Sequence, residues 1–189
     1  MENADAKLFY SSLRGDPEGV LDALAQGGSV AVSDSQGFTP LIIAAQIGYR
    51  DICALLLAHG SDVNEVVLKS KTTALHQAAV KGHEAVVEAL LSWGANVDPQ
   101  DHTGATPLYL ACQEGHVNCV LELLKAGAST SLPNNAGSLP IHVGANQNRV
   151  EVVKTLLNNG LSTNMVSSCD FTTIILSPLS WTANQGIHH

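Results

Sequence analysis

The sequence predicts an all-α solenoid of stacked helix pairs, and three observations favour this fold class. Helix-start motifs recur at intervals of 34, 33 and 33 residues. A short apolar run follows each motif, and a second, one-sided apolar run then ends at a glycine. A fixed period of this length is typical of one supersecondary unit copied along a chain. The motifs are Thr39-Pro40-Leu41, Thr73-Ala74-Leu75, Thr106-Pro107-Leu108 and Leu139-Pro140-Ile141.

Each motif predicts the start of a short first helix. Thr39 has a side chain that accepts hydrogen bonds from the backbone N–H groups left unpaired at a helix start. Pro40 suits the first helical position because its φ is already helical and an N–H is not needed there. The predicted helix ends are residue types that tolerate left-handed backbone, namely Gly48, Gly82, Gly115 and Asn148.

A second helix follows in each copy, with its apolar residues at helical spacing on one face. These residues are Ile52, Leu55, Leu56 and Leu57; Val86, Val87, Leu90 and Leu91; Val120, Leu123 and Leu124; and Val152, Val153, Leu156 and Leu157. The predicted ends of these helices are Gly60, Gly94, Gly127 and Gly160.

The N-terminal stretch predicts a further copy, because one period before Gly48 and Gly60 lie Gly15 and Gly27. A capping aspartate, a first-turn proline and a first-turn acid start its second helix at Asp16-Pro17-Glu18. We expect this copy to cap the stack with a more polar outer face. The first helix of this copy holds Leu8, Phe9 and Leu13, and its second helix is expected to carry Val20, Leu21 and Leu24 inward.

Several strings in register with this period closely resemble the ankyrin repeat: TPLYLA, TALHQAA, the pairs Gly82-His83 and Gly115-His116, GSDVN and GANVD. The resemblance implies an ankyrin-repeat solenoid of antiparallel helix pairs with β-hairpin-like loops along one edge. Two places depart from the family pattern. The loop from Glu65 to Thr72 is one residue longer and lacks the usual glycine, and Leu139 replaces a capping threonine.

The predicted domain spans residues 1–165 and holds about five repeats, at residues 5–33, 34–66, 67–100, 101–133 and 134–165. Residues 166–189 predict either an irregular cap or a truncated sixth repeat. Thr172 lies one period after Leu139, but Pro178 falls within the helix expected there, at a cost of roughly 3 kcal/mol. Apolar residues of this segment are expected to cover part of the last repeat, namely Phe171, Ile174, Ile175, Leu179 and Trp181.

Composition and charge exclude several function classes. The formal net charge is −8 and the nine Lys and Arg residues are scattered, which argues against a nucleic-acid partner because phosphate binding needs clustered cations. The sequence contains no apolar stretch long enough to span a bilayer and starts without a signal-peptide pattern. We therefore expect no membrane insertion and a cytoplasmic location, with the nucleus also open.

The cysteines and histidines predict structural roles. Cys112, His116 and Cys119 lie within eight residues, which is typical of metal ligands, but no fourth ligand completes a zinc site. The family resemblance implies that His76 and His142 bond the backbone of neighbouring loops. No nucleophile, base and orienting acid form a recognisable motif. We therefore expect no metal, no cofactor and no catalysis.

The family resemblance places partner binding on a concave surface made of loop tips and the exposed ends of first helices. Phe38, Ile47 and Val80 are apolar residues expected at exposed positions of this surface. Singly exposed hydrophobic residues are common, but three in adjacent repeats favour a contiguous patch that forms the core of an interface. Trp93 is either an interface residue or packs on the adjacent loop. The candidate partner-binding residues are Ser35, Gln36, Phe38, Gln46, Ile47, Lys69, Lys71, Val80, Lys81, Trp93, His102, Thr103, Gln113 and Glu114.

Two functions follow from these features. The first is a non-catalytic scaffold or adaptor that binds another protein or peptide. The strings TPLYLAC and VNCVLELLKAGAS resemble repeats of the ankyrin and SOCS box family, which implies the substrate-recognition subunit of a cullin-type ubiquitin ligase. No SOCS box is seen, so elongin and cullin binding would require a longer C-terminus.

Asn64 is also a candidate modification site. The string Asp62-Val63-Asn64, with Leu56 eight residues before the asparagine, is similar to the repeat sequence that an asparaginyl hydroxylase modifies in this family. The favoured alternative is an asparagine that ties the loop through backbone hydrogen bonds.

Overall fold

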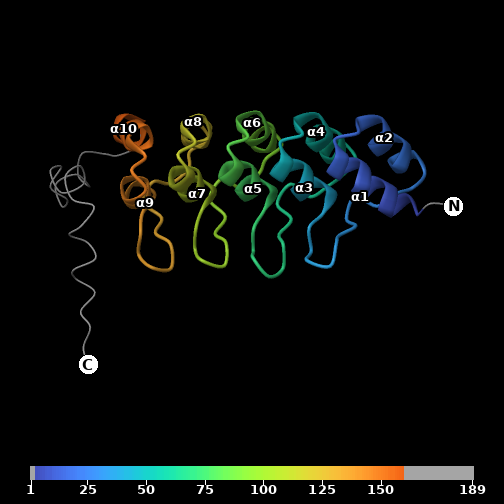
Figure 1. Ribbon diagram of the computed structural model, residues 1–189, viewed down its shortest axis with the longest axis horizontal. Helices are drawn as coiled ribbons and strands as arrows, with labels where there is room; N and C mark the ends of the chain where they lie inside the picture. The colour runs from blue at the N-terminus through green and yellow to red at the C-terminus, as the bar shows by residue number, and fades with distance from the viewer. Residues whose placement is uncertain (1–2, 160–189) are drawn as a thin grey trace, which may run out of the picture.

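The computed structural model describes residues 3–159, which form ten α-helices in five antiparallel pairs (Figure 1). The first helices of the pairs lie in one row, the second helices lie in another, and loops between pairs project beyond the first helices (Figure 1). The predicted fold class is confirmed. The helices are α1 (Ala4–Arg14), α2 (Pro17–Ala25), α3 (Pro40–Ile47), α4 (Arg50–Ala58), α5 (Ala74–Lys81), α6 (Glu84–Ser92), α7 (Pro107–Glu114), α8 (Val117–Lys125), α9 (Pro140–Asn146) and α10 (Val150–Asn159).

Side-chain caps start several of these helices as predicted. The Thr73 hydroxyl accepts from the His76 N–H, and the Thr106 hydroxyl accepts from the Tyr109 N–H. Thr39 differs from the prediction, because it precedes α3 but makes no side-chain cap bond to it. Pro40 still gives α3 a preset first φ, so the helix begins where the motif places it.

The first helices end at left-handed residues, with one shift from the prediction. α5 ends at Lys81 and Gly82 follows with a φ of 77°. α9 ends at Asn146 with Gln147 as its cap, and Asn148 takes the left-handed position one residue later, with a φ of 56°. Gly160 lies outside the described residues.

The core runs continuously through the stack between the two helix rows. Each first helix packs against the first helices of the neighbouring pairs, and each second helix packs against its own equivalents. Equivalent leucines of the second helices form one inaccessible layer, at Leu56, Leu90, Leu123 and Leu156. Repeat proteins gain their stability from such nearest-neighbour interfaces.

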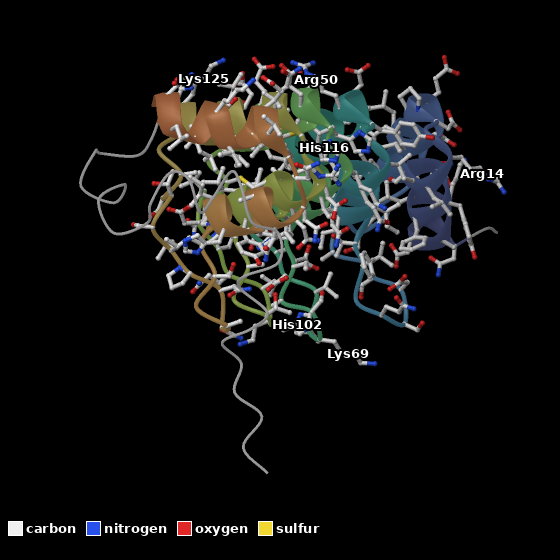
Figure 2. The ribbon with its side chains drawn as sticks, turned by 60° about the vertical axis from the view of Figure 1, so that its left-hand side comes forward. Arg14, Arg50, Lys69, His102, His116 and Lys125 are labelled. Atoms are coloured by element: carbon white, nitrogen blue, oxygen red, sulfur yellow. The ribbon has the colours of Figure 1, made fainter. Side chains whose placement is uncertain are left out.

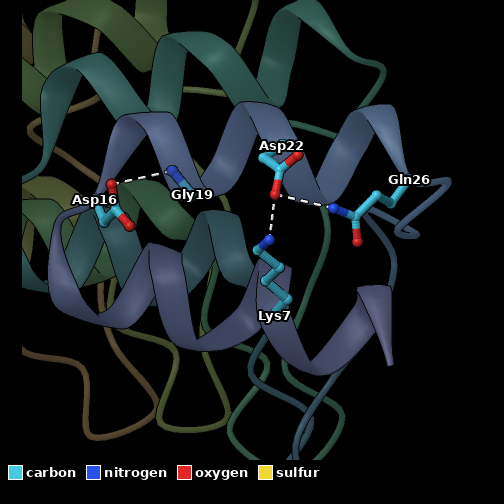
Figure 3. Close-up of polar contacts among 5 residues, drawn as sticks. All are labelled: Lys7, Asp16, Gly19, Asp22 and Gln26. Atoms are coloured by element: carbon cyan, nitrogen blue, oxygen red, sulfur yellow. Dashed lines mark hydrogen bonds and ion pairs between the residues drawn. The ribbon is translucent and has the colours of Figure 1, made fainter. Parts of the chain in front are cut away.

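The N-terminal pair corrects part of the prediction. Leu8 and Val20 are fully buried, but Leu13 and Leu21 are exposed and do not point inward. The outer face of this pair is therefore less polar than expected. An ion pair between Lys7 and Asp22 joins α1 to α2 (Figure 3). The same carboxylate of Asp22 also accepts a hydrogen bond from the Gln26 amide at the end of α2.

Each of the last three helix pairs is connected to the pair before it by one side chain at the start of its second helix. The ring of His83 lies on Gly48 and its Nε2 lies 3.0 Å from the Gln46 carbonyl. His116 makes the same contacts with Gly82 and the Val80 carbonyl, at 3.2 Å. Arg149 replaces the histidine in the last described pair and donates to the carbonyl of Gln113 at 3.1 Å. These bonds fix the ends of the first helices, which carry several of the predicted binding residues.

The structure does not describe the C-terminal segment that the sequence predicts as a cap or a sixth repeat. The cap or sixth repeat at residues 166–189, including Phe171, Thr172, Ile174, Ile175, Pro178, Leu179 and Trp181, lies outside the described residues. Among the helices of residues 3–159, none is long and apolar enough to cross a membrane.

Candidate functional site

The loop tips are hairpin turns held by a side chain at their base. The Asp34 carboxylate accepts from the Gln36 N–H at 2.8 Å and from the Phe38 N–H at 2.9 Å. Asp101 and Asn134 hold the third and fourth loops in the same way. Because each turn is satisfied internally, its tip side chains are free to contact a partner.

Neighbouring tips are also bonded to one another. The His102 N–H donates to the Ser70 carbonyl and the Asn135 N–H donates to the Thr103 carbonyl, both at 2.9 Å. These backbone hydrogen bonds join the last three loops into one edge, and Figure 1 shows these loops projecting side by side beyond the first helices.

The longer loop at residues 65–72 has a different construction. The Val67 N–H donates to the Thr72 carbonyl, and Lys71 takes the left-handed backbone that a glycine adopts in the other loops, with a φ of 54°. Val67 is buried, whereas Leu68 is 84% exposed at the tip. Leu68 was not among the predicted binding residues. The sequence feature that points to it is an apolar run that continues into a loop one residue longer than the family pattern.

The ends of the first helices line the surface above the tips. The Gln46 amide donates to the Gln77 amide oxygen at 3.2 Å, and Gln77 donates to the Thr72 hydroxyl at 3.3 Å. A polar network thus links α3, α5 and the base of the longer loop. Gln113 is held by Glu114, to which it donates at 2.9 Å.

We call the tips at residues 35–38, 68–71 and 102–103, together with the helix ends at residues 46–47, 80–81 and 113–114, the inner surface. Most of its predicted polar residues are accessible. The exposed ones are Ser35, Gln36, Lys69, Lys71, Lys81, His102 and Thr103, and the half-buried ones are Gln46, Gln113 and Glu114.

The predicted apolar cluster of the inner surface needs correction. Phe38, Ile47 and Val80 are half-buried rather than exposed, and Phe38 packs against the core. Phe38 thus anchors its loop, because the turn at Asp34 directs the ring inward. Trp93 is 48% exposed but follows α6 in the row of second helices, so it does not belong to the inner surface.

The histidine after the start motif ties two repeats together. His76 is inaccessible, its Nδ1 accepts from the Thr73 N–H, and its Nε2 lies 3.1 Å from the Ala105 carbonyl. Burial lowers the pKa of His76, although its bond to Ala105 opposes this shift. The prediction of a tie to the next loop is confirmed for His76. His142 binds the N–H of Leu139 within its own repeat.

The cysteines near His116 have the chemistry of core residues. Cys112 and Cys119 are buried, and burial raises their thiol pKa values to about 12 and about 11. Such thiols remain protonated near neutral pH and are poor nucleophiles and metal ligands. Within residues 3–159, no three His, Cys, Asp or Glu side chains lie where they could hold a metal ion.

Asn64 has a defined structural role. Its side-chain oxygen accepts from the Asn96 N–H at 2.7 Å, which ties one repeat to the next. Asp98 at the equivalent position accepts from the Ser129 N–H at 3.1 Å. These contacts are those of a loop-tying asparagine; hydroxylation of Asn64 stays a prediction.

The helix pairs, hairpin loops and inter-repeat ties recur at every copy, and a comparison with known families agrees with them. The family described as "Ankyrin repeats (3 copies)" matches residues 8–101 and 94–167. The chain belongs to the ankyrin repeat family. Proteins built from ankyrin repeats are generally scaffolds for protein interactions.

Several known proteins share these ankyrin repeats. The chain is 39% identical over 105 residues to ankyrin repeat and KH domain-containing protein mask-1 of Caenorhabditis elegans, covering 55% of this chain and 4% of that protein. Over 106 residues it is 37% identical to human ankyrin repeat and KH domain-containing protein 1, covering 56% and 4%. A probable E3 ubiquitin-protein ligase of rice, XBOS34, is 35% identical over 99 residues, covering 51% of this chain and 19% of that protein. The chain thus spans a small fraction of the length of these relatives.

Proposed function

We propose that this ankyrin repeat protein is a non-catalytic adaptor that binds a partner protein on its inner surface, in the cytoplasm or the nucleus. The observation that carries the proposal is the continuous edge of loop tips, whose turns and neighbours are bonded to one another. The side chains on it point outward from a frame that already has its final shape.

A preformed surface suits protein binding for an energetic reason. Ordering a loop on binding costs free energy that subtracts from affinity, and a tip that is already ordered avoids much of this cost. Ser35 and Gln36 are exposed on a tip whose turn is held by the Asp34 carboxylate, so these positions can vary with little effect on the fold. Variation without loss of stability is what recognition of different partners needs.

Affinity capture from cells tests the proposal with two matched variants. Ile47→Glu with Thr103→Arg places new charges on the inner surface, whereas Lys125→Glu changes an exposed lysine at the end of α8. We expect the inner-surface variant to lose its specific partners at least about tenfold by quantitative mass spectrometry, since interfaces depend on a few central contacts. Unchanged circular dichroism and thermal midpoint show that both variants fold. Capture of every partner at wild-type levels by both variants would contradict the proposal.

A second candidate function is substrate recognition for a ubiquitin ligase, and the similarity to rice XBOS34, a probable E3 ubiquitin-protein ligase, favours it. Under this function, partners held on the inner surface receive ubiquitin in cells that express the protein. Ubiquitin-remnant proteomics in cells with and without the protein checks this, together with blotting of captured complexes for elongin and cullin subunits. Partners that bind but gain no ubiquitin, with neither subunit captured, would exclude this second function.

A further inference from the structure

The tip of the longer loop carries both exposed apolar side chains and exposed lysines. Leu68 is 84% exposed and Val66 is 44% exposed, while Val67 between them is buried. The alternation turns two apolar side chains outward and fixes the loop through the third. Lys69 and Lys71 are exposed on the same tip, beside Leu68.

The lysines of this repeat form no ion pair within residues 3–159, whereas four of the nine cations of the chain do. Lys69, Lys71 and Lys81 form no ion pair there, whereas four other cations are paired and Arg149 bonds a carbonyl. Figure 2 shows Lys69 and His102 at the loop tips and Arg50 and Lys125 at the opposite side of the molecule. The paired cations are Lys7, Arg50, Lys125 and Lys154.

Among residues 3–159, no carboxylate lies within ion-pair distance of Lys69 or Lys71. Asp101 in the next loop uses one oxygen to hold its own turn through the N–H groups of Thr103 and Ala105. Glu65 at the base of the longer loop is half-buried. A chain with a net charge of −8 therefore carries a local positive tip next to Leu68, the most exposed large apolar side chain of residues 3–159.

We propose that the tip of the loop at residues 65–72 binds an acidic peptide segment of the partner protein that also carries an apolar side chain. Leu68 and Val66 contact the apolar side chain, and Lys69 and Lys71 contact the flanking carboxylates. The proposal rests on the adaptor function and specifies the chemistry of its partner.

Charge favours a peptide over the other occupants of such a tip. Nucleic acids and anionic membranes are extended polyanions, which the net charge of −8 repels and which few clustered cations are present to hold. A second copy of the chain in a two-fold contact at this tip would bring Lys69 and Lys71 against the same lysines. A short acidic segment contacts only the tip, where Lys69 and Lys71 attract it, and it extends along little of the rest of this acidic chain.

The tip is also held in place for binding. The Ser70 carbonyl accepts from the His102 N–H, and the Ser70 hydroxyl lies 2.7 Å from the Thr72 hydroxyl. The Lys71 N–H donates to the Val67 carbonyl at 2.7 Å. Leu68 is thus presented on a turn bonded at both sides, so a partner does not have to order it.

A peptide array with the whole protein tests the inference. The array holds nonapeptides with a central Leu among Asp and Glu, a matched set with Lys replacing the acids, and a matched set with Ser replacing Leu. We expect binding to the acidic Leu set alone, weakening as NaCl rises from 50 to 500 mM because salt screens exposed charges. Lys69→Glu with Lys71→Glu and, separately, Leu68→Ser should each lower affinity about tenfold or more. Lys125→Glu with Lys154→Glu, on second helices, should leave affinity unchanged.

The opposite results overturn the inference. The inference is wrong if the acidic Leu set does not bind, if the Lys set binds equally well, or if the tip variants bind like the wild type. It is also wrong if the tip instead binds single-stranded RNA, phosphatidylserine vesicles or a second copy of the chain. This failure is distinct from failure of the adaptor function. If Ile47→Glu with Thr103→Arg abolishes partner capture while the tip variants capture normally, the adaptor function stands and the acidic-peptide inference falls.

Discussion

His76 shows at the residue scale how one buried side chain joins two repeats. Its Nδ1 accepts the Thr73 N–H, so its Nε2 carries the proton and donates to the Ala105 carbonyl of the next loop. Protonation of Nδ1 would place its hydrogen against the Thr73 N–H, so the hydrogen bond between these two groups would be lost. The fold therefore holds the imidazole neutral.

This arrangement predicts that stability falls on acidification. The folded-state pKa of His76 is lowered, mainly by burial, so below its ordinary value of about 6.5 the unfolded chain binds more protons. The free energy of unfolding should then decrease as the pH falls from about 7.5 to 5.5, by up to about 1.4 kcal/mol per pH unit from this residue. Urea unfolding of wild type and His76→Gln should give a smaller pH slope for the variant. Equal slopes would show that another group controls this range.

Lys71 carries backbone strain that glycine would relieve. Its φ of 54° is left-handed, which costs an ordinary residue about 1–2 kcal/mol. Lys71→Gly should therefore raise the free energy of unfolding by about 0.5 kcal/mol, because the relief exceeds the added entropy of the unfolded chain. Lys69→Gly on the same tip, where no positive φ is relieved, should lower it slightly. Equal losses for both variants in urea unfolding would rule out the strain.

At the scale of elements, the glycines that end first helices have a second role. Gly82 is left-handed, and a Cβ there would lie 2.6 Å from Nδ1 of the His116 ring. The ring cannot move aside without losing its bond to the Val80 carbonyl. The Gly-His pairs thus connect repeats, since each histidine needs the glycine of the preceding copy.

A pair of alanine substitutions separates this contact from backbone strain. Gly82 and Gly94 have φ values of 77° and 83°, but a Cβ at Gly94 would meet nothing within 4 Å. Gly94→Ala should cost about 1–2 kcal/mol from the left-handed backbone alone. Gly82→Ala should cost about 1–3 kcal/mol more, because the ring of His116 must shift. Similar thermal or urea stabilities for the two variants would show that the ring contact contributes nothing.

The sequence predicted elements well where local chemistry determines them. Capping residues such as Thr73 and Thr106, and glycines such as Gly82, act on their own helix, so their positions define its ends. Exposure in irregular places depends on tertiary packing instead. Phe38 is half-buried against the core, and Leu68 is exposed beside the buried Val67, in a loop that departs from the repeat pattern. No period covers such a loop, so its key binding candidate was missed.

At the scale of the whole molecule, the stack is one-dimensional. The leucine layer passes from repeat to repeat. Within each of the two helix rows that Figure 1 shows, every helix packs on its nearest neighbours. A perturbation in one repeat therefore weakens that repeat and the interfaces beside it before it reaches distant ones. The inner surface crosses three repeats, so its shape depends on these interfaces remaining formed.

Hydrogen exchange measures how far such a perturbation spreads. Leu123 is inaccessible in α8, and Leu123→Ala should cost about 2–5 kcal/mol from lost burial and the cavity left behind. We expect amide exchange to accelerate most in α7 to α10, less in α5 and α6, and least in α1 to α3, because the interfaces transmit the loss stepwise. Val20→Ala in α2 should produce the reverse gradient from the other end. Uniform acceleration of all amides by both variants would instead mean that the stack opens as a single cooperative unit, with partner binding then coupled across the whole inner surface.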